Sequence, residues 1–225
     1  MEAHGLSKKQ LEKVFKFEGF GNKSGPYWFL GIEEGGGSLE QLRIRARRFK
    51  PVEDLHSAEK IGFGMDRYVP TWRTMSRLVM AMKGNRDWRD NSKAQEYQTT
   101  ELGRTDGETF LTELMPLPCP NTREWPYASI CPTRAEYNAM VRPGRIMWLR
   151  SEIDSFKPSF VICYGKGNWP VHKEIFHPVD FNPEFNSQVL VGKRGGTTIL
   201  LLRFLSPDLV GLELIDQIAN RYGKK

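Results

Sequence analysis

Along this chain, apolar runs of strand length alternate with segments in which apolar residues recur at helical spacing. The strand runs are apolar almost throughout, and loops rich in glycine, proline or polar residues follow them. These runs predict strands at residues 27–32, 109–114, 159–164, 188–191 and 197–204. Strands of this kind, alternating with helices, are typical of a mainly parallel sheet covered on both faces. We therefore expect an α/β fold, a three-layer α/β/α arrangement around a sheet of about four or five strands.

Capping residues, glycines and prolines bound the predicted helices. Ser7 and Gln10 form a capping-box pattern, which predicts an N-terminal helix over about residues 7–19. Further helices are expected at residues 38–49, 72–83, 133–156 and 207–221. Pro143 should break the third of these further helices, and the polar, unpatterned residues 85–107 predict a surface excursion.

The composition is that of a globular protein. Apolar residues make up 39% and charged residues 27% of the 225 residues, and no apolar stretch approaches the roughly 20 residues of a membrane span. Since this length is closer to one domain than to two, we expect a single domain over residues 1–225. The N-terminus lacks an apolar signal core and the three cysteines are widely spaced, which predicts a cytoplasmic protein without a disulfide framework.

An excess of basic residues indicates a nucleic-acid partner. The net charge is +6 and the sequence pI is near 9.2. The excess lies in residues 43–50, in residues 142–150, and in Lys166 and Lys173. Arginines interleaved with aromatic residues can contact phosphates and stacked bases, although such charge runs also fit a solvated helix face.

The loops after the predicted strands carry the candidate chemistry, because a parallel sheet binds its ligand beyond the carboxyl ends of its strands. Glu33 and Glu34 follow the first strand, beside glycines that allow close approach of a ligand. The second strand ends near Glu113, and a carboxylate in an apolar run is unfavourable unless it has a partner or a function. A catalytic role and a salt bridge are both open for these side chains.

Four segments of the predicted strands can be compared with known motifs: GIEEG at residues 31–35, FLTEL at residues 110–114, KPSFVICYG at residues 157–165 and FLSP at residues 204–207. In these segments, from the first strand to the last helix, the chain resembles the uracil-DNA glycosylase superfamily. The first strand of that superfamily ends in GQDPY, GMNPG or GEAPG, and GIEEG falls on this motif. The family's second strand delivers a base-pairing Asn, and FLTEL at residues 110–114 places Glu113 there. The segment KPSFVICYG at residues 157–165 resembles the family's P-x-x-I-V-x-L-G. The family's last strand ends in HPSP, where this chain has FLSP at residues 204–207.

The resemblance implies a uracil-DNA glycosylase-like fold and a hydrolase of base excision repair, a monofunctional DNA N-glycosylase acting on uracil or another deaminated base. It implies that Glu33 orients the attacking water, with Arg203 and Ser206 as candidate donors to the leaving base. The expected base-binding residues are Ile32, Glu34, Tyr68 and Glu113. Phe63 is the alternative to Tyr68 as the stacking ring. The expected DNA contacts are Arg123, Lys166 and the wedge residue Leu209.

The motifs also depart from the family. No histidine occupies the last motif, Glu34 replaces the proline of the first, and Glu113 replaces the base-reading Asn. One branch of the superfamily holds an iron–sulfur cluster on four cysteines, which three cysteines cannot supply. His172 and His177 have no cysteine nearby, so we expect no metal and no other cofactor.

Two other functions stay open at this point. The same fold could bind DNA or abasic sites without catalysis, or a small-molecule hydrolase could use Glu33 and Glu34 as an acid–base or metal pair. A serine hydrolase is disfavoured, because no Gly-x-Ser-x-Gly segment is present. Under the glycosylase interpretation, the partner is DNA containing uracil or another deaminated base, and the protein is a monomer that contacts no membrane.

Overall fold

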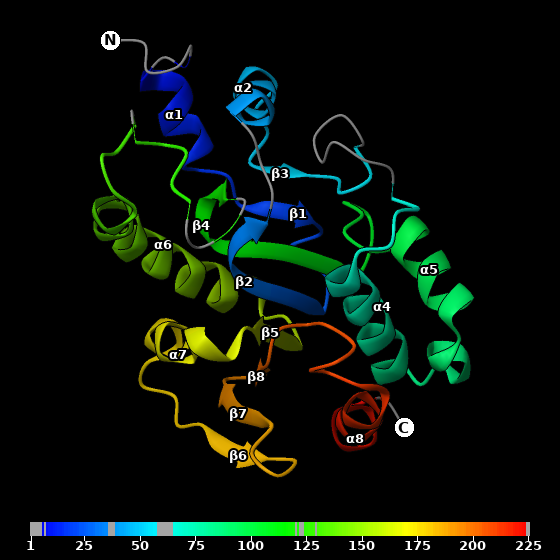
Figure 1. Cartoon of the computed structure of the whole chain (residues 1–225). Coiled ribbons are helices and arrows are strands. Elements are labelled where there is room, and N and C mark those ends of the chain that lie inside the picture. The colour runs from blue at the N-terminus through cyan, green and yellow to red at the C-terminus, as the bar shows by residue number, and fades with distance from the viewer. Residues whose placement is uncertain are drawn as a thin grey trace.

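An eight-stranded sheet crosses the protein in the computed structural model, with helices on both of its faces (Figure 1). The structure describes residues 6, 8–35, 39–57, 65–119, 121, 124–128 and 130–223. The strands are β1 (Gly19–Gly21), β2 (Tyr27–Gly35), β3 (Val52–Glu53), β4 (Thr109–Cys119), β5 (Phe160–Tyr164), β6 (Asn182–Glu184), β7 (Val189–Arg194) and β8 (Thr197–Leu202). Their order across the sheet is β3-β1-β4-β2-β5-β8-β7-β6.

The middle of this sheet is parallel. The strands β4, β2, β5 and β8 lie side by side in the same direction, so that Phe29 stands between Leu111 and Ile162. One edge adds β7 and β6 in antiparallel pairing, and the other adds β1 antiparallel to β4 and β3 parallel to β1. The α/β class and the mainly parallel sheet are confirmed, but the expected four or five strands are too few. The strands β1, β3 and β6 have only two or three residues each, too few for an apolar period to be visible.

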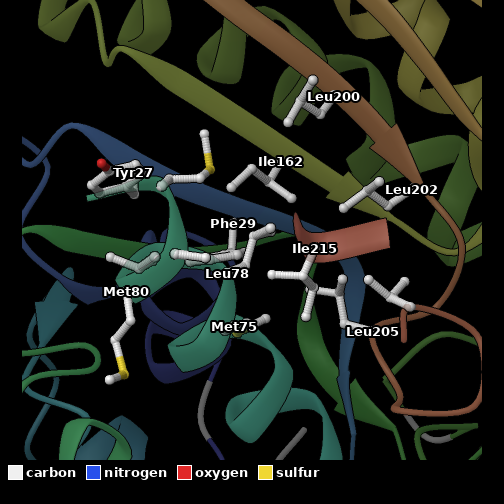
Figure 2. Close-up of a cluster of buried hydrophobic side chains, with 14 of the residues drawn as sticks. Tyr27, Phe29, Met75, Leu78, Met80, Ile162, Leu200, Leu202, Leu205 and Ile215 are labelled. Atoms are coloured by element: carbon white, nitrogen blue, oxygen red, sulfur yellow. The ribbon is translucent and has the colours of Figure 1, made fainter. Parts of the chain in front are cut away.

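The helices form two layers. They are α1 (Lys8–Val14), α2 (Leu39–Arg47), α4 (Pro70–Met82), α5 (Asn91–Thr100), α6 (Arg134–Phe156), α7 (Trp169–Phe176) and α8 (Leu212–Tyr222), with 3-10 turns η1 (Arg86–Arg89) and η2 (Lys166–Asn168). A first apolar cluster lies between the sheet and α4 and α8, where Met75, Leu78 and Ile215 meet Phe29 and Leu200 (Figure 2). A second cluster fills the opposite face, under α6 and α7.

Several helical segments differ from the predictions: α7 is not among the predicted helices, and α8 begins at Leu212 rather than at residue 207. The N-terminal helix ends at Val14, short of residue 19, and Gly19 with its positive φ begins β1 instead. Residues 85–107 are not an irregular excursion: they form η1 and α5, which pack on α4 and bury Trp88 and Tyr97. The helix over residues 133–156 is not broken, because Pro143 lies on its exposed side and the opposite side packs into the second cluster.

The strand β4 is longer than its apolar run. It continues through Pro116 and Pro118 to Cys119, where the sequence predicts a proline-rich loop. Among the described strands only β2 pairs with this part of β4, since β1 reaches no further than Leu111. Proline lacks the backbone N–H and is tolerated on such an unpaired edge. The extension keeps β4 beside β2 as far as Gly35 and Cys119, the last residues of the two strands, and places Met115 and Pro116 at the candidate site.

His172 on α7 is fully buried in the second cluster, and neither ring nitrogen has a hydrogen-bond partner among the described residues. Burial lowers its pKa from 6.5 to about 4. As the pH falls from about 6.5 to about 4, the unfolded chain therefore binds a proton that the folded chain excludes, and the free energy of unfolding should drop by about 3 kcal/mol.

Urea denaturation of the wild type and of His172→Phe between pH 4 and 7.5 measures this contribution. The free energy of unfolding should fall less steeply toward low pH in His172→Phe than in the wild type. The exposed His177, replaced in the same way, provides a matched control that should keep the wild-type slope. If the free energy of unfolding of His172→Phe fell as steeply toward low pH as that of the wild type, His172 would not be the cause of the loss.

Candidate functional site

A pocket lies beside the carboxyl ends of β2 and β5, against β4 and under α4, with a cavity volume of about 60 Å³, room for about four water molecules. Its apolar walls are Phe17, Phe20, Leu55, Trp72, Met75, Leu111, Met115 and Pro116. Its polar side chains are Glu18, Glu34, Glu113, Arg145 and Tyr164. A mostly apolar pocket with a few convergent polar groups is the usual form of a small-molecule or base site.

Glu113 and Tyr164 form a hydrogen-bonded pair in this pocket. The Tyr164 hydroxyl donates to Glu113 Oε1 at 2.7 Å. The second carboxyl oxygen, Oε2, is buried and has no hydrogen-bond partner among the described residues. Gly31, opposite Glu113 on β2, makes room for the pair: a Cβ atom there would lie 2.0 Å from Glu113 Oε2 and 2.5 Å from the Tyr164 hydroxyl. The glycine of the first motif therefore has a packing role.

Burial raises the pKa of Glu113 from 4.5 to about 8, although the hydrogen bond from Tyr164 favours the charged form. The nearby carboxylates of Glu34 and Glu33 raise it further, and the Arg145 guanidinium opposes them. Arg145 makes no hydrogen bond to the Glu113 carboxyl among the described contacts. It donates instead to the main-chain carbonyls of Glu113, at 2.7 Å, and Leu114, at 3.0 Å. At neutral pH Glu113 is thus a protonated, neutral acid.

The two consecutive acidic residues of β2 have different surroundings. Glu34 borders the pocket and accepts a hydrogen bond from Arg45 at 2.8 Å. Glu33 does not border it and is held by Arg134, whose Nη1 lies 2.7 and 2.5 Å from the two carboxylate oxygens. Strict alternation would give Glu33 the face of Gly31, yet Glu34 and not Glu33 borders the pocket. Glu33, opposite Met115, is the last residue of β2 before its pairing with β4 becomes irregular, so regular alternation ends where the two carboxylates diverge.

Both arginines are fixed by further contacts. Arg45 is buried, and its guanidinium lies 4.2 Å from the ring centre of Phe17. Its Nη1 atom has no hydrogen-bond partner among the described residues. Arg134 Nη2 donates to the carbonyls of Asn121 and Glu124, at 2.8 and 2.7 Å. Arg134 therefore ties the end of β2 to the segment that follows β4.

The other predicted site residues lie around the pocket rather than in its lining. Tyr68 is 53% exposed and borders a neighbouring pocket with Arg73, whose guanidinium lies 5.2 Å from its ring. Ile32 packs against the second apolar cluster. Lys166 is exposed, with its ammonium 5.6 Å from the Trp169 ring.

The segment after β8 carries three more of the predicted residues. Arg203 and Ser206 are half-buried and do not line the pocket, and the Ser206 carbonyl accepts from the amides of Leu209 and Val210 in a turn. Leu209 is 40% exposed. Arg123 and Phe63 lie outside the described residues.

Sequence reasoning missed several lining residues. Arg145 stands in the basic run 142–150, which predicts phosphate contacts, and Tyr164 is the last residue of a predicted strand. A hydroxyl-bearing side chain at the carboxyl end of a predicted parallel strand is the sequence signal that could have found Tyr164. Trp72 shares the helical period of its neighbours and is predicted as core. Phe17 falls within the predicted N-terminal helix, so nothing in the sequence placed it at the site.

No family model matches the chain, and none of the curated proteins matches its sequence significantly. The resemblance to the uracil-DNA glycosylase superfamily therefore rests on the motifs. Within the described residues, no three histidine, cysteine, aspartate or glutamate side chains are grouped so that they could hold a metal. None of the described helices combines the length and the apolar character needed to cross a membrane.

Proposed function

We propose that this protein is a DNA N-glycosylase, which hydrolyses the bond between the sugar and uracil or another deaminated base, and that the pocket receives the base. The proposal is carried by one observation: two carboxyl groups with different environments, Glu34 and Glu113, border one pocket with aromatic walls. Glu34 is paired with Arg45, whereas the carboxyl of Glu113 accepts a hydrogen bond from Tyr164 and has its Oε2 atom buried. The place of the pocket supports it, because parallel sheets bind ligands beyond the carboxyl ends of their strands.

The chemistry requires a carboxylate near the sugar. Departure of the base leaves an oxocarbenium-like sugar, which a carboxylate stabilises while it orients the attacking water. We assign this role to Glu34, since it borders the pocket and Arg45 holds it in place. Glu33, the residue favoured by the motif alignment, is assigned to anchoring β2 through Arg134.

The target base must leave the helical stack before it can enter such a pocket. The rings of Trp72, Phe17 and Phe20 line the pocket and offer surfaces against which a planar base can pack. Glu113, at the floor, is the proposed base reader. Tyr68 and Leu209 are exposed outside the pocket and are proposed to contact the opened strand, with Lys166 as a phosphate contact.

Strand cleavage by alkali after base release tests the proposal. Labelled oligonucleotides containing uracil, hypoxanthine or xanthine, single-stranded and paired, are incubated with the protein in the presence of a chelator. We expect release of at least one base by the wild type. The double variant Glu33→Gln/Glu34→Gln, purified in parallel, should release that base at least roughly 10²-fold more slowly and controls for contaminating glycosylases.

Other results of this assay would favour one of the two alternative functions, a DNA-binding module or a small-molecule hydrolase. Binding to these oligonucleotides without release of any base would contradict the glycosylase proposal and favour a non-catalytic module that binds DNA or abasic sites. Hydrolysis of small substrates that requires a divalent ion and ignores DNA would favour a metal-dependent hydrolase built on the Glu33–Glu34 pair.

A further inference from the structure

We propose that Glu113 is the general acid of this pocket and passes the proton on its Oε2 atom to the departing base. The inference rests on the proposed function and adds a second catalytic residue to it. It also assigns the leaving-group chemistry to a residue that the sequence indicated only as a base reader.

The placement of the two carboxyl oxygens carries the inference. A neutral carboxyl group has one O–H donor and one carbonyl oxygen. The Tyr164 hydroxyl donates to Oε1, which makes Oε1 the carbonyl oxygen and leaves the proton on Oε2. Oε2 is buried and has no partner among the described residues, and Glu113 lines the pocket. A base that enters the pocket can therefore supply the missing acceptor.

The surroundings of Glu113 favour the protonated form. Its charged and titratable neighbours are Glu33 and Glu34 on β2, Tyr164 on β5, Arg145 on α6, and Glu18 before β1. Three of these are carboxylates, and Arg145 donates to main-chain carbonyls rather than to the Glu113 carboxyl. Burial and the carboxylates of Glu34 and Glu33 raise the pKa of Glu113 to about 8 against the opposing effects of Tyr164 and Arg145, so the protonated acid predominates at neutral pH.

The proposed step balances as a hydrolysis. The bond between C1′ and the base nitrogen breaks, and its electron pair goes to the base. The proton of Glu113 Oε2 moves to a nitrogen or carbonyl oxygen of the base, which leaves as a neutral molecule. A water oxygen bonds to C1′ and its proton passes to the Glu34 carboxylate. Exchange with solvent then returns a proton to Glu113 and removes one from Glu34, a division of labour expected where two carboxyls have different environments.

Single-turnover base release over pH 5–10 tests the acid role. The probes are oligonucleotides that contain uracil or 5-fluorouracil, and the fluorine makes the second base a better leaving group. The pH profile is also recorded on any other base that the wild type releases. The wild-type rate should fall as the pH rises through about 8. The rate of Glu113→Gln should not fall as the pH rises through about 8. This variant should release uracil roughly 10²–10⁴-fold more slowly than the wild type, and most of that loss should be recovered on 5-fluorouracil.

Glu184→Gln is the matched control, since Glu184 on β6 likewise accepts a hydrogen bond from a tyrosine hydroxyl, that of Tyr222 at 2.7 Å, but lies at the far edge of the sheet and does not line this pocket. It should retain the wild-type pH profile on both substrates. Equal losses on the two bases in Glu113→Gln, or an unchanged pH limb, would overturn the acid role while leaving the glycosylase proposal intact. Absence of base release by the wild type would instead overturn both.

Discussion

Glu34→Gln is expected to lower single-turnover base release by roughly 10²–10⁴-fold, the range that a positioned general base contributes. Glutamine keeps the size of the side chain and a hydrogen bond to Arg45, but it cannot take the proton of the attacking water. Glu33→Gln, one residue earlier, should stay within about tenfold of the wild-type rate, because Glu33 faces Arg134 and not the pocket. Rapid-quench assays with the base that the wild type releases measure the single-turnover rates of both variants.

Each variant also changes an ion pair, so stability must be measured beside activity. Arg45 is buried and Arg134 is partly exposed, and we expect Glu34→Gln to lose more stability than Glu33→Gln. Circular dichroism and urea midpoints show whether a slow variant is folded. A folded Glu33→Gln without activity, beside an active Glu34→Gln, would return the water-orienting role to Glu33 as the motif alignment implies.

Glu113→Gln is expected to raise the free energy of unfolding by about 3 kcal/mol at pH 7, while it slows the reaction. The pKa of Glu113 is about 8 in the folded protein, against an ordinary value of 4.5. Between these two values the unfolded chain has lost the proton and the folded chain retains it, so the wild type loses stability as the pH rises through this window. Glutamine has no proton to lose and avoids this penalty.

Urea denaturation at pH 4.5, 6, 7 and 8 isolates this contribution as the difference between the wild type and Glu113→Gln. The difference should be small at pH 4.5 and grow toward pH 8, opposite in sign to the acid-side loss expected from His172. Glu184→Gln serves again as the control and should show no such growth. A constant difference between wild type and Glu113→Gln at all four pH values would argue that folding does not raise the pKa of Glu113.

The parallel centre of the fold was predictable because its strands are apolar on both faces. The runs that begin at Tyr27, Phe160 and Thr197 match β2, β5 and β8 closely. The edge strands were not predictable, since a segment such as Val52–Glu53 acquires its conformation from pairing with β1 rather than from its own residues. The intact helix at Pro143 has a similar cause, because burial of the opposite side of α6 outweighs one lost backbone hydrogen bond.

The candidate site was predictable in its acids but not in their arrangement. An acidic residue inside an apolar run marked Glu113, and glycines beside carboxylates marked the first motif. Strict alternation along β2 favours Glu33 for the pocket face, whereas Glu34 borders the pocket. The end of regular pairing at Glu33 depends on two strands far apart in sequence and is not visible in the residues themselves. Trp72 and Phe17 line the site for the same reason: tertiary packing, not periodicity, places them there.

Regular pairing of β2 with β4 ends at Glu33 and Met115: from there to Gly35 and Cys119, β2 advances by two residues and β4 by four. Successive side chains of a strand point to alternate faces, so two adjacent acids bring a carboxylate to the pocket whichever face the end of β2 turns toward it. The other acid is then left for an arginine, as Glu33 is for Arg134. The chain thus carries the same chemistry in duplicate, and a one-residue slip of β2 here would exchange the two roles without removing them.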